Sequence, residues 1–195
     1  MNSLSARLCP DAVTMIRLDH THVMVTFHQF RRDSSPMVKE GLVKTVCTAL
    51  EVHAQLEEEI FYPAVRAITQ NEALKKSVPE HAEMRRLIAS LRAMTPTDAR
   101  YDDTFMELMR DVLHHVADEE TIVLPEAERM LGDRLGMLGV EMTKRRLQLV
   151  VPRTGEIAVN LVRAMPVATV AVGLAAILGA ALATWYGSQK TQRLL

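Results

Sequence analysis

The stretch HAQLEEEIFYP, residues 53–63, returns with the same spacing as HVADEETIVLP, residues 115–125. Each copy reads His, three residues, two Glu, four residues and Pro, and the two His are 62 positions apart. On a helix, residues four apart share one face, so His53 lies beside Glu57 and His115 beside Glu119. The repeat therefore predicts two helices that each present an imidazole and a carboxylate on one side.

The repeat extends upstream of both copies. Asp19-His20 precedes His53 by 33 residues from His to His, and Glu80-His81 precedes His115 by 34. Each half of the chain thus contains an acidic residue and His, a loop, and the longer motif, as expected for two similar helical hairpins. Two antiparallel hairpins packed about an approximate two-fold axis bring one element from each of four helices to a shared level.

The soluble part of the chain is predicted to be all-α. Before residue 130 glycine is nearly absent, and apolar residues recur at three- and four-residue spacing, as between Met37 and Leu50. Ser35-Pro36, the polar stretch before Pro79 and the turn residues at 96–103 mark helix starts. We expect an antiparallel four-helix bundle over residues 10–130, with helices at 10–32, 36–68, 79–94 and 102–130. Pro63 and Pro125 should kink or end a turn in the second and fourth helices.

The C-terminal part has a different composition. From Pro166 to Tyr186 the chain runs 21 residues without a charge, about what a helix needs to cross a bilayer. Trp185 and Tyr186 at one end are typical interfacial residues. The pattern predicts a connector helix over 131–164, a transmembrane helix over 165–187 and a short tail over 188–195. The alternative for the apolar stretch is a buried helix of a soluble bundle.

The charges around this stretch predict its orientation. Five basic residues stand before it and two stand after it, which places the N-terminal domain in the cytoplasm of a single-pass membrane protein. These residues are Lys144, Arg145, Arg146, Arg153 and Arg163, then Lys190 and Arg193. Small residues recur at every fourth position of the span, at Ala171, Ala175, Gly179 and Ala183. Such a stripe allows a homo-oligomer to form through close helix contact, although small residues are also common in membrane helices.

The overall composition argues against several classes of protein. The formal net charge is −1, and no long basic block is interleaved with aromatic residues, so no nucleic-acid partner is expected. Cys9 and Cys47 form no C-x-x-C pair, and the N-terminus lacks the apolar core of a secretory signal. Both observations favour a reducing compartment for the soluble domain.

The repeated His and Glu residues are candidate metal ligands. Polar groups that point into an apolar interior are costly unless something binds them, and mixed imidazole and carboxylate ligation is typical of iron or manganese. Glu58, Glu59, Asp118 and Glu120 are either partners of the ligands or solvated. His22, His28 and His114 do not match the repeat and are expected at the surface. The candidate ligands are His20, His53, Glu57, His81, His115 and Glu119, with Glu58 and Glu120 less certain.

Four elements of the sequence resemble the hemerythrin-like, or HHE cation-binding, family over about residues 10–130. They are LDHTH, HAQLEEEIFYP, PEHAEMRRLI and HHVADEETIVLP. The resemblance implies a four-helix bundle with a centre of two non-haem iron ions. It also implies that His20 and His53 hold one iron and that His81 and His115 hold the other. Glu57 and Glu119 would bridge the two ions.

The chain departs from the oxygen-carrying hemerythrins at two points. Those proteins have a further His one turn before the one matched by His81, and here that place is Ser77. Their second carboxylate follows its His by five residues, whereas Glu119 follows His115 by four and Glu120 stands at the five-residue place. The loss of an imidazole leaves a coordination position open, or filled by water or another carboxylate.

We therefore expect a membrane-anchored di-iron protein that binds or senses dioxygen or a related small molecule, such as peroxide or nitric oxide. An alternative is a di-iron oxidase or peroxidase, and another is a protein that binds or senses iron itself. A third hypothesis, which involves no metal, is a tail-anchored helical adaptor whose His and Glu residues are surface pairs. The sequence shows no nucleophile triad that would favour an enzyme.

Overall fold

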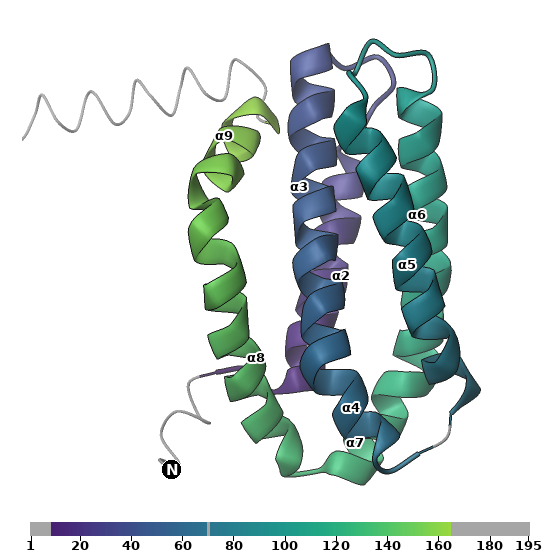
Figure 1. Cartoon of the computed structure of the whole chain (residues 1–195), viewed down its shortest axis with the longest axis vertical. Coiled ribbons are helices and arrows are strands. Elements are labelled where there is room, and N and C mark those ends of the chain that lie inside the picture. The colour runs from purple at the N-terminus through teal and green to yellow at the C-terminus, as the bar shows by residue number, and fades with distance from the viewer. Residues whose placement is uncertain (1–8, 70, 165–195) are drawn as a thin grey trace, which may run out of the picture.

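The computed structural model describes residues 9–69 and 71–164, so the predicted transmembrane helix and the tail lie outside the described residues. The regular structure of these residues is helical throughout, without strands, as the sequence predicts. Four long helices lie side by side and form the bundle (Figure 1). They are α2 (Ala12–His28), α3 (Pro36–Leu56), α5 (Glu72–Ala93) and α6 (Tyr101–Asp118).

Side-chain caps explain where three of these helices begin. Asp11 accepts a hydrogen bond from the Thr14 amide at the start of α2, and Ser35 accepts one from the Val38 amide at the start of α3. Asn71 caps α5, so this helix begins at Glu72 and the expected start at Pro79 is wrong. Pro79 lies inside the helix because Asn71 and the buried Leu74 anchor the preceding turns.

Pro63 and Pro125 each lie just after a π turn, which is wider than a regular α-helical turn. Helix α3 continues through a π turn, η1 (Glu57–Phe61), into α4 (Tyr62–Arg66). Helix α6 continues through η2 (Glu119–Val123) into α7 (Leu124–Leu131). Proline has no N–H to donate, and its ring clashes with the carbonyl four residues earlier in a regular α-helix. A turn closed by an i to i+5 hydrogen bond accommodates it, and the amides of Tyr62 and Leu124 make these bonds to Glu57 and Glu119.

The bundle has two apolar clusters, one on each side of the level of the repeated His residues. One cluster includes Ile16, Leu56, Phe61, Tyr62 and Leu124. The other includes Val23, Leu50, Leu87, Phe105 and Leu108. The His and Glu residues thus lie in a polar layer between two apolar layers, where water has little access.

The predicted connector folds back on the bundle instead of leading away from it. Helix α8 (Arg134–Val150), the short η3 (Val151–Arg153) and α9 (Thr154–Ala164) run alongside α3 (Figure 1). Two glycines permit the approach, because a Cβ on Gly139 would clash with the backbone of Pro10 and one on Gly41 would come within 2.5 Å of the Ala164 nitrogen. The sequence analysis predicted only a connector, because the packing of this segment depends on contacts with α2 and α3, which are far away in the sequence.

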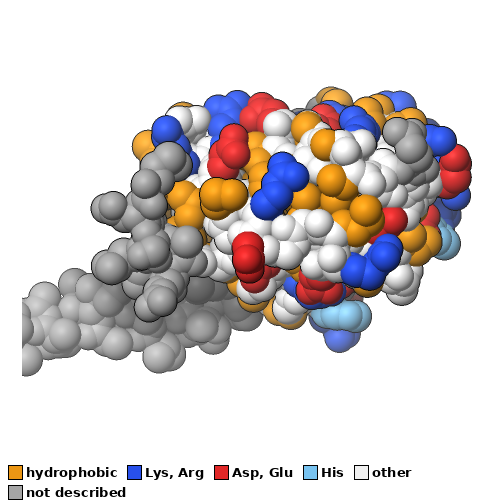
Figure 2. Space-filling model, turned by 90° about the horizontal axis from the view of Figure 1, so that it is seen from below, with side chains coloured by type: hydrophobic (Ala, Val, Ile, Leu, Met, Phe, Trp, Pro, Cys, Tyr) orange, Lys and Arg blue, Asp and Glu red, His pale blue; other side chains and the backbone are white. Residues whose placement is uncertain are grey.

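Basic residues of this segment pair with carboxylates of the bundle. The pairs are Arg145 with Glu59, Arg146 with Asp19, Arg153 with Glu51 and Arg163 with Glu40. On the end of the molecule seen in Figure 2, positive and negative side chains are likewise interspersed. Of the helices that the structure describes, none combines the length and the apolar character needed to cross a membrane.

Candidate metal centre

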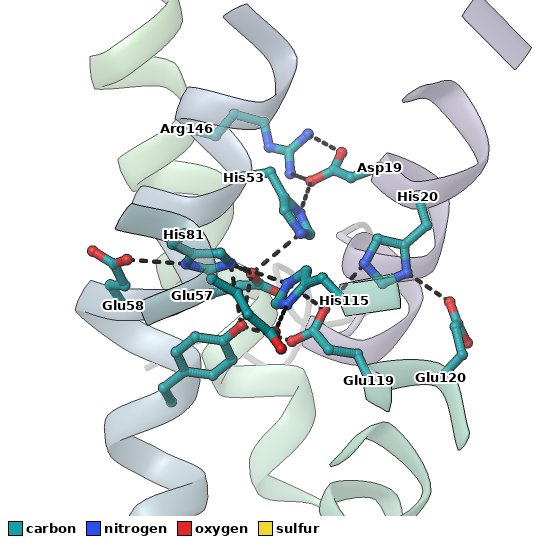
Figure 3. A network of polar contacts seen from close by, with 12 residues as sticks. Asp19, His20, His53, Glu57, Glu58, His81, His115, Glu119, Glu120 and Arg146 are labelled. Atoms are coloured by element: carbon teal, nitrogen blue, oxygen red, sulfur yellow. Dashed lines mark hydrogen bonds and ion pairs between the residues drawn. The ribbon is translucent and has the colours of Figure 1, made fainter. Parts of the chain in front are cut away.

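The side chains of the repeat meet at one level of the bundle (Figure 3). Each of the four long helices contributes one imidazole, and the first residue of each π turn contributes a carboxylate. Every one of these residues is buried, with at most 5% of its surface exposed. The residues brought together are His20, His53, Glu57, His81, His115 and Glu119.

The ligand-capable atoms form two groups that share Glu57. The first group is His20, His53, Glu57 and Glu119, and the second is Glu57, His81 and His115. Within each group all atoms lie within 4.8 Å of one another. The two His of each hairpin fall in the same group, which is the pairing that the family resemblance implies.

The two glutamates stand between imidazoles from different helices. Glu57 Oε2 lies 3.1 Å from His53 Nε2 and 3.4 Å from His81 Nε2. Glu119 Oε2 lies 3.2 Å from His20 Nε2 and 3.4 Å from His115 Nε2. A carboxylate in such a position can contact two ions at once, as the bridging ligands of two-metal sites do.

Each imidazole turns its other nitrogen to a carboxylate outside the centre. The Nδ1 atoms of His81 and His115 lie 2.9 Å from Glu58 and from Glu80 respectively. The Nδ1 atom of His20 lies 2.7 Å from Glu120. A carboxylate on Nδ1 holds the proton there and leaves Nε2 with a free lone pair, which is how metal-binding His residues are oriented. For His53 the corresponding partner is Asp19, at 3.4 Å.

These outer carboxylates follow the two-fold repeat. Asp19 and Glu80 each precede a His of the centre, yet each contacts the other His of its own hairpin. Glu58 and Glu120 each follow a glutamate of the centre and contact a His of the opposite hairpin. Of the residues left open by the sequence, Glu58 and Glu120 therefore contact imidazoles from outside the ligand groups, whereas Glu59 pairs with Arg145. The sequence did not predict the contacts of Asp19 and Glu80 with the other His.

Arginines hold three of the outer carboxylates in place. Arg85 makes two hydrogen bonds to Glu58, at 2.9 and 2.8 Å. Arg17 contacts Glu120 at 3.1 Å, and Arg146 reaches Asp19 from α8 with one bond of 2.7 Å and a second, shorter one. Together the His53 and Arg146 hydrogen bonds lower the pKa of Asp19 to about 2, even though burial alone would raise it. Asp19 is thus a carboxylate at neutral pH.

Tyr62 enters the centre and was missed by the sequence analysis. Its hydroxyl lies 2.7 Å from Glu119 Oε1, 3.2 Å from Glu57 Oε2 and 3.4 Å from His81 Nε2. In a regular α-helix, residues five apart would point about 140° away from each other. The π turn instead places Tyr62 over Glu57. A signal was present in the repeat, because the equivalent position of the second copy is the apolar Leu124.

Ser77 stands on α5 where the oxygen-carrying hemerythrins have a further His. Its side chain is buried and donates a 3.1 Å hydrogen bond to the carbonyl of Ala73 in its own helix. The ring of Tyr62 stacks on His81, with centroids 5.6 Å apart. The phenol oxygen of Tyr62 lies 3.4 Å from His81 Nε2. Burial, followed by Glu57 and Glu119, raises the pKa of Tyr62 well above its usual value, so it is a neutral proton donor.

The centre shifts the pKa values of three of its groups, two upward and one downward. Burial and the neighbouring Glu119 raise the pKa of Glu57 to about 7. Although burial lowers the pKa of His115, its hydrogen bonds to Glu119 and Glu80 outweigh this and raise it to about 10. His81 shows the opposite shift, to about 4, because burial and the adjacent His115 both disfavour its charged form. A cation bound here would replace these protons.

The donor set and its unsatisfied atoms fit bound cations. His53 Nε2 and Glu57 Oε1 are buried atoms without a hydrogen-bond partner, which is costly for polar groups in a protein interior. Imidazole and carboxylate ligands on both sides of a shared glutamate suit iron or manganese. The remaining His residues, His22, His28 and His114, are exposed as the sequence predicts.

A small cavity adjoins the centre on the side of Val23 and Leu50. Its volume is about 10 Å³, and all four imidazoles contribute to its lining. The other lining side chains are mostly apolar and include Met84, Ile88 and Val112. Such a volume holds about one water-sized molecule.

The fold and the centre together define a helical bundle with a buried, two-part cluster of His and Glu that could hold cations. Residues 11–127 match the hemerythrin HHE cation-binding domain, and the chain belongs to this family. A crystal structure of a hemerythrin HHE cation-binding-domain-containing protein from Mycobacterium kansasii superimposes with a TM-score of 0.62. The match has 19% sequence identity and covers 80% of this chain and 99% of the other, so it supports the fold.

The chain is also similar to a DNA nickase from Nostoc sp. (strain PCC 7120 / SAG 25.82 / UTEX 2576). The two are 29% identical over 107 residues, which make up 55% of this chain. The chain spans only 30% of the length of that protein. Most of the nickase therefore lies outside the match.

Proposed function

We propose that this chain is a di-iron protein that binds or senses a small molecule such as dioxygen, peroxide or nitric oxide. The observation that carries the proposal is the cavity of about 10 Å³ against all four imidazoles of a cation site. A diatomic molecule is close in size to the one water that such a space holds. An organic substrate does not fit there, and this argues against an oxidase that acts on one.

The positions of the residues indicate which ion each of them would hold. His20 and His53 would hold one ion, and His81 and His115 the other, with Glu57 and Glu119 shared between them. Bound iron would supply electrons and an open coordination position for the small molecule. The outer carboxylates keep each Nε2 directed inward, and the apolar clusters exclude water. Manganese uses the same kinds of ligand and is the alternative metal.

A second candidate function is the turnover of peroxide. Tyr62 favours it, because a neutral phenol 2.7 Å from Glu119 and 3.4 Å from His81 can supply a proton within the centre. The two candidates differ in whether the small molecule is released unchanged or consumed.

The deciding experiment is iron content and visible absorption of the full chain, first without oxygen and then with it. About two irons per chain and a band that reverses when oxygen is removed would support binding or sensing. Steady consumption of added peroxide would support turnover. If iron binds but neither oxygen, peroxide nor nitric oxide alters the spectrum, iron sensing becomes the better reading. Failure to bind iron or manganese in a fixed ratio would refute the proposal and favour the adaptor.

We also propose that the chain is anchored in a membrane with its metal domain in the cytoplasm. The support is the uncharged stretch from Pro166 to Tyr186 and the excess of basic residues before it. The main argument for the anchor is the length of the uncharged span.

A further inference from the structure

The side of α9 that faces away from the bundle is apolar. Residues three and four apart lie on the same side of an α-helix, and on this side α9 presents four apolar residues. Val159, Leu161 and Val162 expose 50, 53 and 56% of their surface, and Ala158 is exposed between them. These four residues are called the outer face of α9.

Both charged residues of α9 pair with the bundle. Glu156 lies 3.2 Å from Arg92 of α5. Arg163 lies 3.2 Å from Glu40 of α3. A helix on the surface of a soluble protein normally has the reverse arrangement, with its apolar side toward the core and its charges outward. The arrangement in α9 therefore favours apolar surroundings for the outer face.

The packing of α9 on α3 fixes the direction of the outer face. A Cβ on Gly41 would come within 2.5 Å of the Ala164 nitrogen, so the two helices touch through their backbones. Rotation of α9 about its axis would break this contact and both ion pairs. The apolar surface continues at Val151 of η3 and Leu147 of α8, which expose 61 and 59% of their surface. In Figure 1 these elements form one flank of the molecule, beside α3.

The sequence that follows α9 indicates what covers this flank. The uncharged stretch from Pro166 to Tyr186 begins two residues after Ala164, and two residues span at most about 7 Å. If this stretch crosses a bilayer, α9 lies at the lipid surface. The alternative is that the stretch folds over α9 in water. A helix that is apolar on all sides needs apolar surroundings on all sides, and the outer face would cover only one of them.

We propose that the outer face of α9 lies in the head-group region of a lipid bilayer, in contact with the upper part of the acyl chains. This inference rests on the membrane anchor proposed above. The partner is the apolar part of the lipid, because the outer face contains no basic residue that would select anionic head groups. Four side chains bind weakly alone, but a span two residues away keeps them at a high effective concentration near the lipid.

The test uses a fluorescent label on Val162→Cys of the full chain in phosphatidylcholine nanodiscs. Cys9→Ser removes the partly exposed thiol, and Cys47 is buried. A nitroxide on the upper acyl chain should quench the label. Iodide in the water should quench it about fivefold less than the same label on Met106→Cys. Met106 is exposed on α6, which lies across the bundle from α9 (Figure 1).

A charge on the outer face provides the second arm. Ala158→Glu should raise the iodide quenching of the Val162 label about threefold, because a carboxylate is disfavoured among acyl chains. Ala89→Glu makes the same change at an exposed position of α5 and should leave the quenching unchanged. Helical circular dichroism and iron content identify a variant that fails to fold, and Val159→Glu is the replacement in that case. Equal quenching in Ala158→Glu and Ala89→Glu would overturn the proposal.

Flotation with phosphatidylcholine vesicles distinguishes this inference from the anchor. If the chain floats but iodide quenches the labels at Val162 and Met106 equally, the lipid contact of α9 is overturned and the anchor stands. If the chain floats and neither quencher reaches the Val162 label, a second copy covers the outer face and the lipid contact is again overturned. A chain that stays in the aqueous phase would overturn both, and protection from iodide there would favour residues 166–186 folded over α9.

Discussion

Asp19 on α2 lies 3.4 Å from Nδ1 of His53 on α3 and is itself held by Arg146 of α8. A helix outside the four-helix bundle thus takes part in orienting a residue of the metal centre. A chain cut at residue 150 would keep Arg146 but lose α9, which packs against α3. Experiments on the centre are therefore best made with the full chain.

Arg146→Gln should weaken metal binding without unfolding the protein. The change leaves Asp19 without its charged partner, so the carboxylate holds His53 less firmly. Loss of outer partners of this kind typically costs about 10–100-fold in metal affinity, and a value near tenfold is expected. Arg145→Gln is the matched control, because Arg145 pairs with Glu59 away from the centre. Competition with a chelator measures both variants, and equal affinities would contradict the role given to Arg146.

Removal of a central ligand should have a larger effect than removal of an exposed His. His53→Ala and Glu119→Ala each take away a buried group of the ligand sets, so iron content should fall from about two ions per chain to one or less. His114→Ala changes an exposed side chain next to His115 and should leave the iron content unchanged. Elemental analysis of the three purified proteins decides the matter. The assignment fails if all three retain the same iron.

Tyr62→Phe should separate metal binding from reactivity. The ring and its stacking on His81 remain, and only the hydroxyl near Glu119 is lost. Iron content should be unchanged, while any peroxide consumption should fall about 100-fold if Tyr62 is the proton donor. Tyr101→Phe, in the other apolar cluster, is the control. Undiminished peroxide consumption in Tyr62→Phe would rule out proton donation by this residue.

The metal-free and metal-bound proteins should respond to pH in opposite directions. The folded metal-free protein raises the pKa of His115 from 6.5 to about 10, so it holds a proton that the unfolded chain releases. Its contribution to stability is complete below pH 6.5 and is lost as the pH rises toward 10. Metal needs the neutral imidazole, so binding releases this proton and becomes stronger over the same range.

Urea unfolding of the metal-free protein, and anaerobic titration with Mn²⁺ or Fe²⁺ in weakly buffered solution, measure the two trends. Between pH 6.5 and 10 the parent chain should release the His115 proton when metal binds. His115→Gln has no such proton and should show a smaller release than the parent. A metal affinity that does not depend on pH between 6.5 and 10 would contradict the pKa assigned to His115.

The full chain should fractionate with membranes and require detergent for extraction. The uncharged stretch of 21 residues is long enough to cross the hydrocarbon layer. A chain that ends at Ala164 keeps α9 and lacks this stretch, so it should remain in the supernatant. Recovery of the full chain in the supernatant without detergent would refute the anchor.

Much of the centre could be predicted from one local regularity. Residues four apart share a helix face, so the helical period alone predicts that His53 lies beside Glu57 and His115 beside Glu119. The repeat of the two halves then placed His20 and His81 at the same level. Glu119 rather than Glu120 lies in a group that could hold an ion, because the four-residue spacing is maintained up to the start of the π turn.

Other features depended on the tertiary structure. Tyr62 reaches the centre because a π turn rotates it over Glu57, and no α-helical period predicts that rotation. Asp19 orients His53, and Arg146 holds Asp19, through contacts between side chains that are 34 and 127 positions apart. The start of α5 at Glu72 likewise depends on the cap of Asn71 and on core packing, which outweighed the signal of Pro79.

The sequence by itself determined the helical class, the doubled hairpin and the residues that point inward, because these follow from the spacing of side chains along a helix. The tertiary structure decided which carboxylate contacts which imidazole, how α8 and α9 return along α3, and where cavities remain. Those features depend on distances between helices, which the volumes of packed side chains and the close approaches at Gly41 and Gly139 set.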